Sequence, residues 1–299
     1  MSDDRQVILI TGAGSGMGLT TSLYLAARNY RVYGTVLSPE EGESLSREAR
    51  QRNVSVCPVP MDVTKAEQIQ AGVDGVLREA GHLDGVVHFA GLGLRGFFED
   101  LSMEEIRKVF DVNVFGVMAV TRAVLPHMRQ RRQGRIIITT SAAGRLGSMT
   151  ISGYCSTKFA LEGLAECLHQ EMYPLGVHVS VVEPGLIQTP HFTVNRNRAK
   201  RAMDPASPYY RWFCQHEHMV DKLLATNKFT TEDIAREVHR ILTARRPRLR
   251  YPVSAKLKIV LALRSYLPAT LFESIYWGSV RRMVTAPRVQ ATGLSNESQ

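Results

Sequence analysis

The chain of 299 residues lacks the features that mark secreted or membrane-spanning proteins. Its four cysteines form no Cys-x-x-Cys pair, and no secretory signal precedes the first apolar run. No run of about 18 or more apolar residues is present, which argues against a transmembrane helix. We therefore expect a cytoplasmic protein, in a reducing compartment, with no membrane span.

The composition also lacks any extreme of charge or polarity. Charged residues make up 22% of the chain and hydrophobic residues 44%, values that exclude extensive disorder. The net charge is +9, and much of the excess lies beyond residue 190, in Arg196, Arg198, Lys200, Arg201 and residues 245–250. Such a region can attract anionic substrates, membranes or nucleic acid, but it is more often a solvated face. We expect no nucleic-acid partner.

Short apolar runs alternate with segments able to form helices. The predicted strands are residues 7–11, 31–36, 54–59, 85–89, 135–140 and 178–183, with a last strand near 250–253. This alternation predicts an α/β protein with a doubly wound parallel sheet and helices on both of its faces. Because α/β folds of about 250 residues are often single units, we expect one domain over residues 1–299.

The helices between these strands are predicted from periodicity and from their first residues. We expect Thr64 to cap a helix over 65–80 and Ser102 to cap one over 103–110. A helix over 153–173 has apolar residues at helical spacing, and Thr231 opens another that ends near residue 244. Pro126 is expected to interrupt the helix that runs towards residue 131.

Residues 190–228 break the alternation, and we predict that they form a substrate lid. The segment is polar, contains prolines and carries Tyr209, Tyr210, Trp212, Phe213 and Met219. Aromatic surfaces of this kind favour a bulky apolar ligand. Packing of the lid against the core would explain the same residues equally well.

Residues 255–285 predict a helical extension, whose first turns are apolar on one side and basic on the other. Such a helix could lie on a membrane surface, so peripheral membrane contact is one alternative. More often a stripe of this kind covers a pocket or a subunit contact. The polar residues 290–299 are expected to form a disordered tail.

The triplet His216-Glu217-His218 suggests a metal site. A site would need a further ligand and supporting groups around it, and the sequence shows neither. We expect the triplet to be solvated and predict no metal.

Four glycines, at positions 12, 14, 16 and 18, lie between a predicted strand and a predicted helix. Glycine has no Cβ to block close approach, and the amino terminus of a helix presents free N–H groups and a positive dipole. In this context a phosphate-binding turn is favoured over a structural turn without a ligand.

Tyr154 and Lys158 stand four residues apart on the predicted helix 153–173, so both side chains leave the same face. A neighbouring ammonium lowers the pKa of a phenol, and a phenol so tuned can pass a proton near neutral pH. Ser141 follows an apolar run and therefore lies at the carboxyl end of a strand, where open α/β sheets bind ligands. Together with the glycine turn, these residues predict a nicotinamide-dependent oxidoreductase.

These motifs and their order resemble the short-chain dehydrogenase/reductase family over residues 7 to about 190. They are Thr11-Gly-x-x-x-Gly-x-Gly, Asp62-Val63, Ala90-Gly91, Asn113, Ser141, Tyr154, Lys158 and Pro184-Gly185. The resemblance implies a Rossmann-type domain, NAD or NADP as cofactor, hydride transfer between a carbonyl and an alcohol, and a homodimer or homotetramer. The sequence Thr35-Val36-Leu37 is also locally similar to the hydroxysteroid and retinol dehydrogenase branch.

The resemblance also implies a role for each site residue. Tyr154 is the general acid/base, Ser141 holds the substrate oxygen, and Lys158 binds the nicotinamide ribose and lowers the pKa of the tyrosine. Asn113 anchors a water that relays protons. The implied cofactor site consists of Gly12, Gly14, Ser15, Gly16, Met17, Gly18, Val36, Leu37, Asp62, Val63, Ala90, Gly91, Asn113, Tyr154, Lys158, Pro184, Gly185, Ile187 and Thr189.

The chain departs from the family pattern at two places. His88 and Phe89 stand where members usually carry two asparagines, and we expect His88 to be a packing substitution because Tyr154 already fills the acid/base role. The end of the second strand carries Val36 and Leu37, neither the acid that selects NAD nor the arginine that accepts the phosphate of NADP. An uncharged edge offers that phosphate no cation, so NAD is favoured over NADP.

The sequence therefore predicts an NAD(P)-dependent alcohol dehydrogenase or ketoreductase. Its substrate is expected to be a secondary alcohol or ketone of a bulky apolar molecule, such as a steroid, polyketide, terpenoid or acyl compound. The alternative is a catalytically silent dinucleotide-binding scaffold or regulator of the same fold, which His88 and Phe89 motivate. An epimerase or dehydratase with the same Tyr-x-x-x-Lys pair usually has a different glycine spacing.

Overall fold

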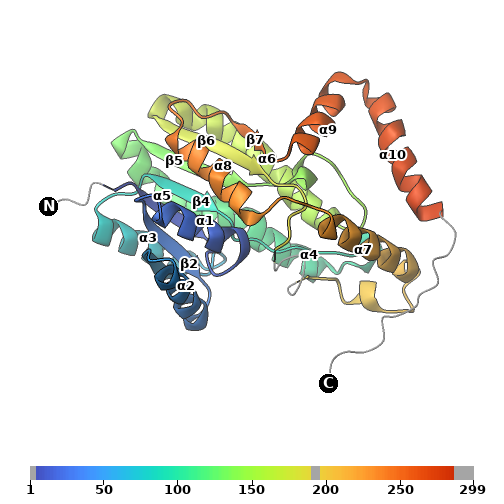
Figure 1. Cartoon of the computed structure of the whole chain (residues 1–299), viewed down its shortest axis with the longest axis horizontal. Helices are drawn as coiled ribbons and strands as arrows, with labels where there is room; N and C mark the ends of the chain where they lie inside the picture. The colour runs from blue at the N-terminus through green and yellow to red at the C-terminus, as the bar shows by residue number, and fades with distance from the viewer. Residues whose placement is uncertain (1–4, 190–195, 286–299) are drawn as a thin grey trace. The chain divides into compact units, whose positions relative to one another are not determined.

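Seven parallel strands form one sheet in the order β3-β2-β1-β4-β5-β6-β7 (Figure 1). The strands are β1 (Val7–Thr11), β2 (Arg31–Val36), β3 (Val56–Pro60), β4 (Gly85–His88), β5 (Gly134–Thr139), β6 (Val177–Glu183) and β7 (Arg250–Pro252). The computed structural model describes residues 5–189 and 196–285. The parallel sheet predicted from the alternation of strands and helices is confirmed.

Helices cover both faces of the sheet, which explains why its strands are continuous apolar runs. One buried cluster joins the sheet to α3 (Ala66–Ala80), α5 (Val117–Arg131) and α6 (Ser152–Met172). A second cluster on the other face joins it to α1 (Gly16–Ala26), α2 (Pro39–Gln51) and α8 (Thr231–Thr243). The chain therefore has the doubly wound, Rossmann-type architecture expected from the sequence.

The predicted helix caps are partly right. Ser102 caps α4 (Met103–Phe110) through a capping box in which its side chain accepts from the Glu105 N–H and the Glu105 carboxylate accepts from the Ser102 N–H. Thr64 caps nothing: its hydroxyl donates to Asp62 Oδ1 at 2.8 Å, and α3 begins after Lys65. Asp62 Oδ1 accepts from both the N–H and the hydroxyl of Thr64, and this local turn keeps Thr64 outside the helix.

The prediction that Pro126 interrupts a helix is wrong, because α5 continues through it to Arg131. Val120, Val124 and Met128 of this helix are fully buried against the sheet, and this packing outweighs the hydrogen bond that proline removes. The helical stretch Met103–Arg131 is, within the described residues, the one long and apolar enough to cross a membrane. Val117, Val120, Val124 and Met128 of this stretch belong to the core of the sheet.

The predicted lid contains a short turn of 3-10 helix (Arg201–Met203) and α7 (Tyr210–Ala225), while its first residues, 190–195, lie outside the described part of the chain. Phe213 is completely buried, and the Tyr209 ring stacks on Phe97 with centroids 4.9 Å apart. Trp212 remains 42% exposed. Much of the aromatic character of this segment is thus used in packing.

The expectation that His216-Glu217-His218 is solvated is wrong for two of the three residues. His216 and Glu217 are both 7% exposed, because α7 turns this face towards the segment after β4. Arg196 and Arg198 form ion pairs with the Glu217 carboxylate, so part of the basic region is neutralised inside the protein.

By its contacts the chain divides into two units, residues 1–257 and 258–299. The described part of the second unit consists of most of α9 (Ala255–Tyr266) and of α10 (Ala269–Thr285). On α9, Ile259, Leu263 and Tyr266 are exposed at helical spacing. The predicted tail, residues 290–299, lies outside the described residues.

Candidate active site and cofactor cleft

A cavity of about 860 Å³ opens at the carboxyl ends of the strands, where the strand order reverses between β1 and β4. Open α/β sheets bind ligands at this place. Apart from Asn113, every residue that the sequence analysis assigned to the site lines this cavity. The structure thus brings together side chains from six strand-to-helix connections.

The glycine turn has the shape that a phosphate group requires. Gly12 and Gly16 have φ values of +68° and +54°, a conformation that other residues rarely adopt. A Cβ on Gly18 would lie 2.0 Å from the Gly12 carbonyl oxygen, so only glycine fits there. The first N–H groups of α1 have no partner within the helix and are available to an anion. These residues fit the pyrophosphate of a dinucleotide.

Thr11 at the end of β1 joins that strand to the segment after β4, where the sequence has His88 and Phe89. The Thr11 hydroxyl accepts from the N–H groups of Phe89 and Ala90, each at 3.2 Å. His88 is 2% exposed and shares a hydrogen bond of 3.1 Å with Thr121. Burial lowers the pKa of His88 to about 3, so it is neutral at physiological pH. These contacts agree with the prediction that His88 is a packing substitution.

The edge of the cavity after β2 carries an acid that the sequence analysis missed. Val36 is 3% exposed, whereas Leu37 is 71% exposed, and Glu41 from α2 accepts a hydrogen bond from the Leu37 N–H at 2.9 Å. The same carboxylate lies beside Gly14, where a Cβ would come within 2.8 Å of it. Glu41 could have been noticed because it stands three residues after Ser38, the spacing of a capped helix. The edge is therefore acidic and not uncharged.

Ser141, Tyr154 and Lys158 meet on one wall of the cavity. Ser141 caps a 3-10 turn after β5, with its Oγ accepting from the Ala143 N–H at 3.1 Å. Lys158 donates to the Thr139 carbonyl oxygen at 2.8 Å, and its Nζ lies 5.6 Å from the centroid of the Tyr154 ring. The i, i+4 spacing on α6 has placed both side chains on the same face, as predicted.

Burial dominates the ionisation of this wall. It raises the pKa of Tyr154 to about 12, although a hydrogen bond with Ser141 acts in the opposite direction. It lowers the pKa of Lys158 to about 8, and the nearby Glu162 carboxylate partly offsets this. The lowered phenol pKa expected from the sequence is not seen in this structure and stays a prediction.

Asn113 lies behind the cavity wall, fully buried in a turn of π-helix (Asp111–Gly116). Its Nδ2 donates to the Leu92 carbonyl oxygen at 2.8 Å and to Thr157 Oγ1 at 3.1 Å, and its Oδ1 accepts from the Leu92 N–H at 2.7 Å. The side chain is thus used to join α6 to the segment after β4. Helices with π turns often mark functional sites.

Further residues line the cavity that the sequence analysis did not assign to the site. They are Thr35, Glu41, Met61, Thr64, Phe89, Leu92, Gly93, Glu104, Arg107, Lys108, Asp111, Val112, Thr139, Thr140 and Asn197. Met61, Phe89 and Thr140 directly follow strand ends, so the place of these three beside the motif residues could have been inferred from connection order alone. Within residues 5–189 and 196–285, no group of three His, Cys, Asp or Glu side chains could hold a metal ion.

Comparison with protein families identifies this architecture. The family model described as short chain dehydrogenase matches residues 6–200, about two thirds of the chain. The chain belongs to the short-chain dehydrogenase family. It is therefore an NAD(P)-dependent alcohol dehydrogenase or ketoreductase, as the resemblance of its motifs implied.

The chain is also similar to named dehydrogenases and reductases over most of its length. The chain is 32% identical to human retinol dehydrogenase 5 over 285 residues, which cover 90% of this chain and 86% of that protein. It is 32% identical to human 17-beta-hydroxysteroid dehydrogenase type 1 over 273 residues, which cover 87% and 81%. A crystal structure of a single-site variant of actinorhodin polyketide ketoreductase with NADPH superposes with a TM-score of 0.74 at 25% identity, covering 85% of this chain and 98% of that one. The similarity to the retinol and hydroxysteroid branch is confirmed.

Proposed function

We propose that the enzyme transfers hydride between a nicotinamide dinucleotide and a secondary alcohol or ketone, with Tyr154 as the general acid/base. The observation that carries the proposal is one cavity whose wall holds Ser141, Tyr154 and Lys158 and whose floor is the glycine turn. In this arrangement one bound ligand can contact an acid/base group, a hydrogen-bonding hydroxyl and a phosphate-binding turn at the same time.

The bound nicotinamide would supply or accept the hydride, and the chain's own residues would handle the proton. In the oxidative direction the Tyr154 phenolate takes the hydroxyl proton while the hydride leaves the carbinol carbon, and the C–O single bond becomes a carbonyl. In the reductive direction the Tyr154 hydroxyl returns that proton to the carbonyl oxygen. Ser141, already hydrogen-bonded to Tyr154, would hold the same oxygen.

Asn113 would take part in proton transfer through its backbone, because its side chain lies behind the cavity wall. Its side chain is fully engaged, so any water that it anchors would be held by its backbone carbonyl. Turns of π-helix shift the backbone hydrogen bonds by one residue and can leave such a carbonyl available. Lys158, fixed by Thr139, would reach the ribose of the dinucleotide.

The preference for NAD is also part of the proposal, and Glu41 supports it. A carboxylate beside Leu37 and Gly14 can accept hydrogen bonds from a free 2′-hydroxyl, and it repels a 2′-phosphate. The sequence analysis favoured NAD because the edge offered no cation. The structure supplies a second reason, an anion on that edge.

A bulky apolar substrate is supported by apolar side chains in the cavity and by the relatives. Leu92 and Val112 line the cavity, are partly exposed and are not assigned to the dinucleotide. The names of the relatives refer to a retinol, a hydroxysteroid and a polyketide.

A turnover screen tests this function. Purified enzyme would be mixed with NAD or NADP and secondary alcohols of the steroid and aliphatic classes, with the primary alcohol retinol included for comparison, and with NADH or NADPH and the matching ketones or retinal, while absorbance of the reduced nicotinamide is followed. We expect turnover with large apolar pairs and a higher kcat/KM with NAD. Dinucleotide binding without turnover of any pair would overturn the proposal and favour a silent scaffold.

A further inference from the structure

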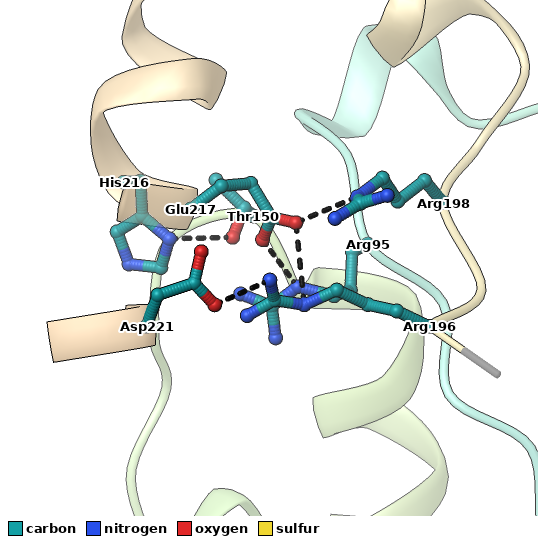
Figure 2. Close-up of polar contacts among 7 residues, drawn as sticks. All are labelled: Arg95, Thr150, Arg196, Arg198, His216, Glu217 and Asp221. Atoms are coloured by element: carbon teal, nitrogen blue, oxygen red, sulfur yellow. Dashed lines mark hydrogen bonds and ion pairs between the residues drawn. The ribbon is translucent and has the colours of Figure 1, made fainter. Parts of the chain in front are cut away.

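The carboxylate of Glu217 on α7 contacts three arginines, Arg95, Arg196 and Arg198 (Figure 2). Glu217 Oε1 accepts from Arg95 Nε at 2.6 Å, and Oε2 accepts from Arg198 Nε at 2.8 Å. Arg196 Nε lies 3.3 Å from the same Oε2. The Glu217, Arg95 and Arg196 side chains are only 10%, 8% and 5% exposed, so this cluster is inside the protein.

The charges of the cluster require Glu217. Burial by itself would raise the pKa of Glu217, but attraction to Arg95 and hydrogen bonds from Arg198 and Arg95 lower it, so the group is a carboxylate. Asp221, one helical turn further along α7, pairs with Arg196 at 2.7 Å and is 56% exposed. Three cations thus face two carboxylates, and one of the two is in contact with solvent. Removing Glu217 would leave buried guanidinium groups without their main anion.

Each arginine lies within two residues of a residue that lines the cavity. Arg95 belongs to the wall segment, residues 93–96 after β4, and Arg196 and Arg198 flank Asn197. Gly93 and Asn197 both line the cavity, and the Asn197 side chain donates to the Gly93 carbonyl oxygen at 2.7 Å.

Backbone hydrogen bonds bind the two pieces together. The Arg95 N–H donates to the Asn197 carbonyl at 3.0 Å, and the Ala199 N–H donates to the Arg95 carbonyl at 2.8 Å. On its other side the wall segment is bound to Thr150, whose carbonyl accepts from the Gly96 N–H at 2.7 Å. These backbone bonds join residues 95–96 to residues 197–199 and to Thr150, and the Glu217 carboxylate contacts the arginine side chains of the first two segments.

The same helix also reaches the approach to the catalytic tyrosine. His216 shares a hydrogen bond of 3.0 Å with the Thr150 hydroxyl. Thr150 has a φ of +63°, a conformation that is strained for a β-branched residue, and it lies four residues before Tyr154. Strain of this kind persists only where surrounding contacts hold it. Neighbouring residues of α7 thus fix both the wall segment and the turn that begins α6.

We propose that Glu217 is a positioning residue for the substrate: through Arg95 and Arg198 it holds residues 93–96 and 197–199 as the substrate-facing wall beside Tyr154. The proposal rests on the proposed function, because the wall matters only where a substrate binds. It concerns the substrate and not the dinucleotide, whose glycine turn lies on the β1–α1 connection.

Amide hydrogen exchange tests the positioning without any need for turnover. In Glu217→Ala and in the isosteric Glu217→Gln, exchange at the N–H groups of Arg95, Gly96 and Ala199 should accelerate at least about tenfold. Exchange in β1 and β5 should stay within about twofold of the wild type. Unchanged exchange at the three amides would overturn the proposal. Equal acceleration throughout the sheet would show a merely structural role and overturn it as well.

Kinetics then test the consequence for substrate. With a ketone turned over by the wild type, KM should rise at least about tenfold in both variants, kcat should change less, and the dinucleotide Kd should stay within about twofold. Glu171→Gln makes the same chemical change at an exposed carboxylate on α6, outside the arginine cluster, and as the control it should leave KM within about twofold. Faster exchange with an unchanged KM would overturn the assigned role.

Chemical rescue separates lost charge from lost packing. Formate should enter the space left in Glu217→Ala, pair with the arginines and lower KM, whereas the neutral formamide should not. Equal effects of formate and formamide would overturn the electrostatic argument. If the wild type turns over no ketone, the proposed function fails, and the amide exchange still decides whether Glu217 holds the wall.

Discussion

Tyr154→Phe is the most direct test of the mechanism, because it removes one oxygen and keeps the ring that packs in the cavity wall. The lost hydroxyl is hydrogen-bonded with Ser141. One such bond contributes about 1 kcal/mol, which corresponds to a fall in Tm of about 2–4 °C in a protein of this size. The variant should therefore fold, and the distant glycine turn should bind dinucleotide with a Kd within about twofold of the wild type.

The expected loss of turnover is much larger than the loss of stability. A positioned acid or base contributes about 10² to 10⁴ in rate, which is about 2.7–5.5 kcal/mol of barrier. Lys158 is held by the Thr139 carbonyl oxygen at 2.8 Å and so does not replace the phenol. We therefore expect kcat/KM to fall by about 10³ to 10⁴, the upper half of that range.

The assay is the change in absorbance of reduced nicotinamide with the best substrate pair from the screen, together with a fluorescence titration of dinucleotide binding. Tyr173→Phe makes the same chemical deletion at a ring that is 59% exposed, and it should leave both quantities unchanged. A folded Tyr154→Phe enzyme that binds dinucleotide and retains more than about a tenth of the wild-type kcat/KM would refute the assignment.

Three further predictions follow from the geometry of the cleft. Lys158→Met removes the ammonium whose Nζ lies 5.6 Å from the centroid of the Tyr154 ring. Because the phenolate is the active form in alcohol oxidation, the pH at which kcat/KM reaches half its maximum should rise by about 1–2 units. An unchanged pH profile would contradict this role of Lys158. Glu41→Gln should raise the ratio of kcat/KM with NADP to kcat/KM with NAD by about tenfold. Glu43→Gln on the same helix should leave this ratio unchanged. An unchanged ratio in Glu41→Gln would count against an acidic ribose edge. Gly18→Ala places a Cβ 2.0 Å from the Gly12 carbonyl oxygen and should weaken dinucleotide binding at least about tenfold. The control is Gly75→Ala on α3, whose Cβ would meet nothing within 4 Å. This control should raise the free energy of unfolding in urea by about 0.5–1 kcal/mol. Equal Kd values for the two glycine variants would be inconsistent with the close packing of the turn.

Val36, the last residue of β2, shows how a prediction from sequence changes once burial is known. From the sequence, Val36→Asp is the natural substitution to strengthen discrimination against NADP. In the structure Val36 is 3% exposed and packs in the cluster beneath α1 and α2, so an aspartate there would be buried without a partner. Leu37 and Glu41 are the positions through which the edge can be altered without disturbing the core.

The fold was predictable to within one or two residues at most strand ends, because each strand is an apolar run between turns. The exceptions have physical causes. Thr64 is bound to Asp62 in a local turn and does not cap α3. Pro126 lies inside α5 because its neighbours in the helix are buried against the sheet. Packing against the sheet involves residues that are distant in the chain, so the pattern of a single helix does not report it.

The amino-acid sequence by itself determined the features that depend on neighbours in the chain. They are the βα alternation, the glycines that only a tight turn needs, and the spacing that puts Tyr154 and Lys158 on one face of α6. Only the tertiary structure decided that the Glu41 carboxylate lies beside Gly14, that the Asn113 side chain bonds to Leu92 and Thr157, and that Glu217 is buried among arginines. Arg95 and Glu217 are 122 residues apart, and no local pattern reports contacts between segments that meet only after the sheet has formed.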